Sequence, residues 1–344
     1  MIVWLEFLGV TALILFSGTK LTRYGDIISE KSGLSRMWLG LVLMAGVTSL
    51  PELAAGLSAV ASDLPDIAVG NILGSCIFNV LILGLLDTLS RKVPLSSKVN
   101  QANVLSAGMS ILFLGGVSLS LFLGDRLPGL AWMGLYTPLI VAGYFGTMRM
   151  SFRFEKRRTA MAGALVEDRE ASSMTLRAAV LRYALHAAVV VGSAIFLPSI
   201  AERIAAMTGL GQTFVGNIFV AVSTSLPELT VCIAALRIGA VDMAVGNIFG
   251  SNIFNMFMLA LQDIFYFKGP ILSRVESQHL IPSLLAIAMT GLAIAGLIYN
   301  AEKKHFIWAW DSFGIILIFA VDLVLLYLVP VSYTHLTLPT KRIV

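Results

Sequence analysis

Two copies of one short motif carry the groups that could do chemistry. The residues TSLPEL occur at 48–53 and again at 224–229, each time inside a long apolar stretch. Each copy places a glutamate, Glu52 or Glu228, directly after a proline. A charged side chain at the centre of a membrane-spanning helix costs about 3 kcal/mol on the insertion scale. Because no lysine or arginine lies on these faces, the sequence predicts a mobile cation as the missing positive charge.

The prolines make backbone oxygens available beside the glutamates. Proline has no amide hydrogen, so Pro51 and Pro227 leave carbonyls about one turn upstream without their usual helical partners. Irregular backbone at membrane depth is tolerated where it is buried or lines a cavity. Spacings of three, four and seven put the neighbouring oxygen-bearing residues on one helix face. These residues are Ala45, Thr48, Ser49 and Glu52 in the first copy, and Ala221, Thr224, Ser225 and Glu228 in the second.

A second polar stripe follows each motif. Its members are spaced by four, and they are Asn71, Ser75 and Asn79 in one copy and Asn247, Ser251 and Asn255 in the other. Gly70 and Gly74 would let a neighbouring helix approach closely. Each hydroxyl or amide taken alone could equally serve to bind helices together. The stripes are therefore candidate ligands only in combination with the glutamates.

The oxygen atoms indicate which cation is bound. Calcium takes about six to eight oxygens and tolerates bidentate carboxylates, so two glutamates with the carbonyls of Thr48 and Thr224 supply about six. Their two negative charges balance one calcium ion. The remaining hydroxyl, amide and carbonyl oxygens suit sodium better than a transition metal, for which histidine or cysteine is expected.

Composition places the chain in a lipid bilayer. It is 57% hydrophobic and 13% charged, with a mean hydropathy of +0.87, far from the balance of soluble domains. A spanning helix needs about 20 mostly apolar residues. Ten segments meet this requirement, at 2–19, 37–60, 66–90, 101–123, 128–148, 177–199, 212–236, 242–267, 280–300 and 307–330. We expect an all-α membrane protein with ten transmembrane helices and no second folded domain.

Lysine and arginine collect in alternate connections, above all in the linker 149–176. Because such residues stay cytoplasmic in short loops, this linker and the connection at Lys98 are predicted to be cytoplasmic. Both termini and the connections at Asp63, Arg203 and Lys268 are predicted to lie outside. The net charge of +4 and the pI near 9.1 follow from this bias. We therefore expect neither a nucleic-acid partner nor a protein partner. The polar tail 331–344 is expected to be non-native and is assigned no role.

An internal repeat relates the two halves. Setting each residue against the one 176 positions later aligns DIAVGNILGSCIFN at 66–79 with DMAVGNIFGSNIFN at 242–255, and Asp87 with Asp263. Five predicted crossings separate equivalent points, so the second copy enters the membrane from the opposite side. The sequence thus predicts two inverted five-helix repeats, 1–148 and 177–330. Secondary transporters with this construction bind their ions near the midplane.

With these paired motifs, the chain resembles the sodium/calcium exchangers of the cation/calcium antiporter superfamily. The resemblance implies a multi-pass protein, expected in a prokaryotic-type cell membrane, that transports calcium and sodium without any cofactor. It implies a calcium site formed by Glu52, Glu228 and the carbonyls of Thr48 and Thr224. It implies an outer sodium site formed by the Ala221 carbonyl, Ser225, Ser75 and Glu228, an inner one formed by the Ala45 carbonyl, Ser49, Ser251 and Glu52, and a centre lined by Asn79 and Asn255.

The chain departs from the family pattern at a few positions. Asn255 stands where many microbial and potassium-dependent members carry aspartate, which argues against dependence on potassium. Val47 and Ser223 stand where the family often has glycine. Cys76 stands where the second copy keeps Asn252. None of these departures removes a carboxylate from the implied site.

Several functions fit these residues. The leading interpretation is an antiporter that exchanges sodium for calcium by alternating access. Two buried carboxylates could also bind protons, which would make the chain a calcium/proton antiporter of the same fold. A passive cation channel, with the glutamates at a constriction, belongs to a different class. The spans show neither a nucleophile beside a base nor a zinc motif, so we do not expect an enzyme.

Overall fold

The computed structural model of this chain describes residues 2–90, 93–161, 173–208, 222–301, 303–304 and 307–328. Within these ranges the chain is almost entirely helical. The longer helices are α1 Ile2–Ser32, α5 Pro65–Leu89, α6 Ala102–Leu123, α7 Tyr136–Met161, α8 Leu176–Ala194, α9 Leu197–Met207, α11 Leu226–Arg237, α12 Val241–Phe265, α13 Leu280–Tyr299 and α14 Trp310–Leu328.

Between α1 and α5 the chain forms one broken helix. Its pieces are α2 Arg36–Leu39, a π-helical turn η1 Gly40–Met44, α3 Ala45–Thr48 and α4 Leu50–Ala61. Short 3₁₀ turns occur at η2 Leu95–Lys98, η3 Gly124–Arg126, η4 Ile271–Ser273 and η5 Ser277–His279. Strands β1 Gly129–Leu130 and β2 Met133–Gly134 form a small antiparallel hairpin in which Gly129 pairs with Gly134.

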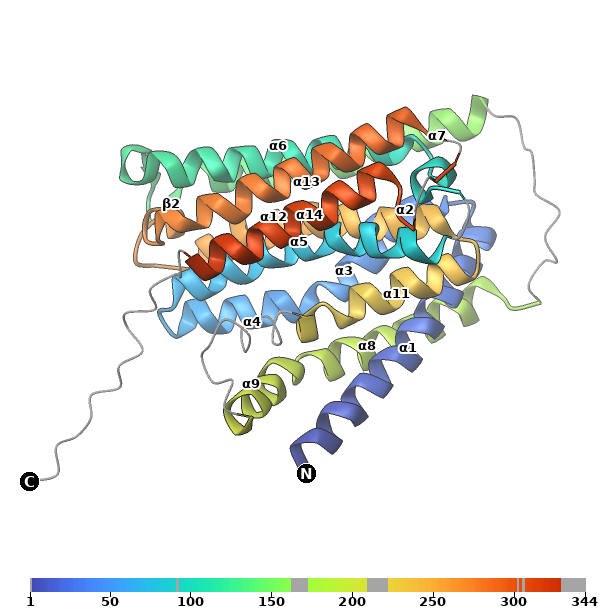
Figure 1. Cartoon of the computed structure of the whole chain (residues 1–344), viewed down its shortest axis with the longest axis horizontal. Helices are drawn as coiled ribbons and strands as arrows, with labels where there is room; N and C mark the ends of the chain where they lie inside the picture. Colours follow the sequence, from blue (N-terminus) through green and yellow to red (C-terminus); the bar gives the residue numbers. More distant parts are fainter. Residues whose placement is uncertain are drawn as a thin grey trace, which may run out of the picture.

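Helices α5 and α12 lie side by side in the middle of the bundle (Figure 1). Helices α6 and α13 pack together on one side of this pair, and α14 packs against α5 and α13. On the other side lie α3, α4 and α11 (Figure 1). Helices α1, α8 and α9 form the outermost layer, where α1 contacts α11. The elements that carry the two TSLPEL motifs therefore lie on the same side of the central pair.

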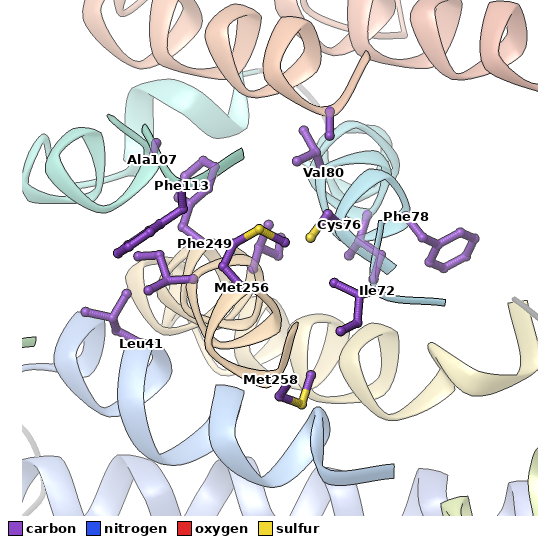
Figure 2. Close-up of a cluster of buried hydrophobic side chains, with 14 of the residues drawn as sticks. Leu41, Ile72, Cys76, Phe78, Val80, Ala107, Phe113, Phe249, Met256 and Met258 are labelled. Atoms are coloured by element: carbon purple, nitrogen blue, oxygen red, sulfur yellow. The ribbon is translucent and has the colours of Figure 1, made fainter. Parts of the chain in front are cut away.

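The core lies where α12 meets α5 and α6. Figure 2 shows Phe249 and Met256 of α12 between Phe113 of α6 and Cys76 and Ile72 of α5. Helices α5 and α12 are apolar on most faces and are largely enclosed by protein, as expected for helices buried in the centre of a larger bundle. In contrast, α1 exposes large apolar side chains along much of its length, which suits contact with lipid.

Glycines let the broken helix lie directly on α12. A Cβ atom added at Gly246 would stand 2.5 Å from the carbonyl oxygen of Met37, and one at Gly250 would meet the backbone of Leu41. Only glycine allows backbones to approach this closely. In the first copy, a Cβ atom at Gly70 would lie 3.2 Å from the ring of His279.

By length and apolar composition, six helices of the described chain could each cross a membrane, and the bent pair Arg36–Thr48 and Leu50–Ala61 could form a seventh crossing. Several of the ten expected segments differ from expectation or are only partly described. Segment 2–19 is the first part of α1, which continues to Ser32, and segment 177–199 runs from α8 into the start of α9. Segment 128–148 opens with the hairpin, and its helix α7 continues to Met161, into the expected linker. Of segment 212–236, residues 222–236 are described and include most of α11. Segment 307–330 contains α14, and its last two residues lie outside the described ranges.

The sequence repeat extends to hydrogen bonds at the ends of the central helices. An oxygen of Asp66 accepts the amide N–H of Glu276 at 2.8 Å and pairs with Nε2 of His279 at 3.0 Å. The equivalent oxygen of Asp242 accepts the amide N–H of Asn100 at 2.6 Å and Nδ2–H of Asn103 at 3.2 Å. Each partner is offset from its counterpart by the same 176 positions.

A second pair of buried aspartates closes the opposite ends of the same two helices. Asp87 accepts the amide N–H of Leu95 at 2.8 Å, and Asp263 accepts that of Ile271 at 2.6 Å. A second backbone N–H, of Ala309 for Asp87 and of Gly134 for Asp263, is accepted at 2.8 Å in each half. The side-chain partners differ between the halves. Asp87 forms an ion pair with Lys304 at 2.9 Å, whereas Asp263 accepts the hydroxyls of Tyr136, at 2.8 Å, and Thr137. Both halves therefore have a buried aspartate that accepts backbone N–H groups. Its side-chain partner is a lysine in one half and two hydroxyl groups in the other.

Candidate cation-binding site

Each TSLPEL motif forms a break in a helix. Ser49 has φ −94° and ψ 1°, and its counterpart Ser225 has φ −89° and ψ 9°. These angles lie in the sparsely populated bridge region that active-site residues often adopt. Proline follows at the start of α4 and of α11, and the two pieces of the first broken helix meet at 42°. The local sequence thus produces the same irregular turn twice.

The two turns bring the glutamates to the interior. Glu52 is 2% exposed and Glu228 is 1% exposed. The hydroxyl of Ser49 donates to Oε1 of Glu228 at 3.4 Å, so the first motif contacts the carboxylate of the second. In each glutamate, Oε2 is buried and has no hydrogen-bond partner within the described ranges.

No basic side chain of the described residues forms an ion pair with either glutamate. The described part of the chain also holds no group of three or more His, Cys, Asp or Glu side chains that could bind a metal ion. The candidate site is therefore two carboxylates surrounded by neutral oxygens. Such a donor set suits a hard cation that prefers oxygen ligands.

Asparagines link the two central helices across the repeat. Nδ2–H of Asn79 donates to Oδ1 of Asn252 at 3.0 Å, and Nδ2–H of Asn252 donates to the carbonyl of Cys76 at 3.2 Å. Nδ2–H of Asn255 points at Sγ of Cys76, at 3.5 Å. Their amide nitrogens are thus engaged. Three buried oxygens lack a partner among the described residues, namely Oδ1 of Asn79, Oδ1 of Asn255 and Oγ of Ser251.

The structure also places most of the other predicted ligands. The hydroxyl of Thr48 lies 3.5 Å from Oδ1 of Asn247 and 3.4 Å from the carbonyl oxygen of Ala45. That carbonyl also accepts the amide N–H of Ser49 at 3.1 Å, so the chain itself occupies it here. Thr224, Ser225 and Ser75 are buried. Ala221 lies outside the described residues.

Sequence reasoning missed one member of this constellation. Asn252 follows Ser251 by one position and so falls off the spacing of four that defined the stripe. It nevertheless joins Asn79 to Cys76 and orders the centre of the site. The mismatch between Asn252 and Cys76 in the repeat alignment was the signal that could have identified it, because it is one of the few polar differences there.

The chain matches a family model at 2–145 and 178–331, described as sodium/calcium exchanger protein. It is 28% identical to the sodium/calcium exchanger MaX1 of Methanosarcina acetivorans over 87% of this chain and 91% of that protein. It is 30% identical to the inner membrane protein YrbG of Escherichia coli over 71% of this chain and 74% of that protein. A solved structure of the sodium-calcium exchanger NCX_Mj superposes with a TM-score of 0.71 at 20% identity, covering 94% of this chain and 98% of that one.

Proposed function

This chain belongs to the sodium/calcium exchanger protein family, and from that premise we propose that it is a secondary antiporter that exchanges sodium for calcium. Glu52 and Glu228 would bind one calcium ion together. Sodium ions would use the same carboxylates with the hydroxyls of Ser49, Ser75, Ser225 and Ser251. Because both ions need the same two carboxylates, binding of one excludes the other.

One observation carries the proposal. Two glutamates from opposite halves of the chain are buried where the two motifs meet through Ser49 and Glu228, and no positive side chain pairs with them in the described ranges. Leaving two like charges uncompensated at membrane depth is strongly unfavourable. The partnerless oxygens of Asn79, Asn255 and Ser251 indicate that something outside the protein completes the site. A calcium ion supplies both the charge and the ligand geometry.

We further propose that the ten segments form two inverted repeats that alternately open the site to either side. The equivalent hydrogen bonds of Asp66 and Asp242 support a structural relation between the halves. The matching turns at Ser49 and Ser225 support the same relation. Inverted repeats with broken helices around a midplane site are typical of transporters that rock one part against the other.

The test is calcium-45 uptake by purified protein in sealed vesicles. An outward sodium gradient in potassium-free buffer should drive accumulation of calcium above its outside concentration. If calcium only equilibrates, without accumulating under any gradient, the chain is a passive channel. If none of the gradients moves calcium, the proposed function is wrong.

The proton-coupled alternative rests on the partnerless Oε2 atoms of Glu52 and Glu228, which could each take a proton. The same vesicles distinguish it. Accumulation of calcium driven by a pH gradient, with no response to sodium, would replace sodium by protons as the coupling ion.

A further inference from the structure

Gln262 of α12 is a fully buried polar side chain outside the candidate site. Its exposed fraction is 0%. Within the ranges that the structure describes, neither Oε1 nor Nε2 has a hydrogen-bond partner. A buried amide without hydrogen-bond partners is destabilising. The presence of glutamine at position 262 is therefore not explained by packing alone.

The amide lies directly against the backbone of Gly56 on α4. A Cβ atom at Gly56 would stand only 1.9 Å from Nε2 of Gln262. Gly56 follows Glu52 by four residues and so lies on the same face of α4, one turn further along. On α12, Gln262 follows Asn255 by seven residues and shares its face. The amide is therefore about one helical turn, roughly 5.4 Å of rise, from the level of Glu52.

A hollow opens one further turn along the same two helices. It has a volume of about 460 Å³ and is lined by Leu57 and Val60 of α4, by Asp63, and by Tyr266 and Lys268 beyond the end of α12. Asp63 accepts from Nζ of Lys268 at 2.7 Å and from the hydroxyl of Tyr266 at 3.2 Å. Gln262 does not line this hollow, but helical spacing puts it at a level between Glu52, one turn before Gly56, and Val60, one turn after Gly56.

The other half of the chain does not repeat this arrangement. The counterparts of Gly56 and Gln262, 176 positions away, are Cys232 and Leu86. Cys232 is held by its own contacts with the Ala244 carbonyl and with Asn247, and Leu86 is apolar. At the equivalent positions, the chain therefore carries no side-chain amide. The glycine and the glutamine occur together on one side of the molecule only.

We propose that Gln262 is a transient ligand for ions that travel between this hollow and Glu52. Its Oε1 would take the place of one water oxygen on a passing calcium or sodium ion, while Gly56 leaves room for Nε2 of the same amide. This inference rests on the proposed function. In the proposed topology the hollow faces outside, so Gln262 would serve the outer entry only.

The test compares three substitutions in sealed vesicles of known orientation. Gln262→Met removes the oxygen and nearly keeps the shape, whereas Gln262→Glu retains an oxygen at the same reach. Gln278→Leu removes another amide from the same side of the molecule and serves as the matched control. Calcium-45 flux is measured while calcium is varied first on the Asp63 side and then on the opposite side.

Gln262→Met should raise the half-saturating calcium concentration about tenfold on the Asp63 side, the size of one net oxygen contact. The maximal rate and the half-saturation on the opposite side should stay as in wild type. Gln262→Glu should restore the low half-saturation, and Gln278→Leu should match wild type.

Equal effects on both sides, or no effect in a Gln262→Met protein that elutes as wild type in size-exclusion chromatography, would overturn the inference while the proposed function stands. If Gln262→Met does not fold, the test uses Gln262→Glu alone. A Gln262→Glu protein that folds but shows an altered half-saturating calcium concentration on the side opposite Asp63 would also overturn the inference. Absence of calcium flux in wild type would instead refute the proposed function.

Discussion

At the scale of single residues, the site is defined by oxygen atoms that the protein leaves without partners. Ser49 reaches Glu228 from the other half of the chain, and the amide nitrogens of Asn79 and Asn255 are turned away by Asn252 and Cys76. These contacts hold the nitrogens and leave the oxygens available. In the proposed function these oxygens would be the cation ligands, because cations bind oxygen and not N–H groups.

The two glutamates provide the first prediction. Glu52→Gln and Glu228→Gln should each abolish calcium transport, because each removes half of the balancing charge and a bidentate ligand. Both variants should fold, since glutamine has the same shape. Calcium-45 flux and size-exclusion chromatography measure the two properties. Glu30→Gln, near the exposed end of α1, is the control and should transport normally; calcium flux in either site variant would remove the glutamates from the site.

At the scale of elements, the irregular pieces have identifiable causes. Proline cannot donate an amide hydrogen, so each LPEL sequence restarts a helix after Ser49 or Ser225. The glycines at 246 and 250 let the turn before Ala45 lie on the backbone of α12. The aspartates at the ends of α5 and α12 bind backbone N–H groups of the following segments. The helix breaks at the prolines, the close packing at the two glycines and the hydrogen bonds of the aspartates together hold the motifs against α5 and α12.

The anchor at Asp87 allows a second prediction. Lys304→Met should lower the free energy of unfolding by about 3–5 kcal/mol, because it leaves a buried carboxylate without its cation. The side chains of Lys304 and Asp87 are 2% and 0% exposed. Thermal unfolding in detergent measures the loss, and Lys303→Met, at an exposed neighbour, is the matched control. Adding Asp87→Asn to Lys304→Met should recover part of the stability; equal losses in both lysine variants would contradict the ion-pair explanation.

At the scale of the whole molecule, contacts between loops agree with the predicted sides of the membrane. Side chains that contact each other belong to loops that the count of lysine and arginine assigns to the same side. Lys268 contacts Asp63, and both were expected outside. Lys304 contacts Asp87, next to the expected cytoplasmic loop at Lys98. Arg203 contacts Glu6 near the amino terminus, and both were expected outside. The fold therefore agrees with the alternation of loops, and the choice of inside or outside remains a prediction from the basic residues.

The third prediction tests that choice. Cysteines introduced at Ser62 and Arg157 should react differently with a membrane-impermeant thiol reagent added to intact cells, and only the first should be labelled. Ser62 is preferable to its neighbour Asp63, whose φ of 60° suits few side chains. The native Cys76 and Cys232 are buried and free, so background labelling should be low. Labelling at 157 in intact cells would reverse the orientation.

The fourth prediction concerns charge movement across the whole protein. With asparagine at 79 and 255, the centre holds two carboxylates, so one calcium ion neutralises it. Exchange for about three sodium ions, as the family resemblance implies, would carry one positive charge, worth about 2.3 kcal/mol per 100 mV. Clamping the vesicle potential in potassium-free buffer should therefore change the calcium gradient at equilibrium by tens of fold. A gradient insensitive to potential would indicate neutral exchange, and a need for potassium would contradict the interpretation of Asn255.

Much of this protein could be predicted from the chain alone. Its assignment to the membrane proteins follows from composition. Its internal repeat and its two glutamates follow from polar residues that recur 176 positions apart within apolar segments. Those signals are local or periodic, so they survive without knowledge of packing. Pro51 and Pro227 act on their own helices, and the breaks at Ser49 and Ser225 appear where the motif put them.

Only the tertiary structure decided which groups face one another. The contact of Ser49 with Glu228, the role of Asn252 and the burial of Gln262 against Gly56 join residues about two hundred positions apart. The hairpin before α7 and the extension of α7 to Met161 likewise depend on what surrounds them. Such pairings are set by how helices pack around α5 and α12. The spacing of residues along one helix constrains that packing only weakly, because any polar face can meet several partners.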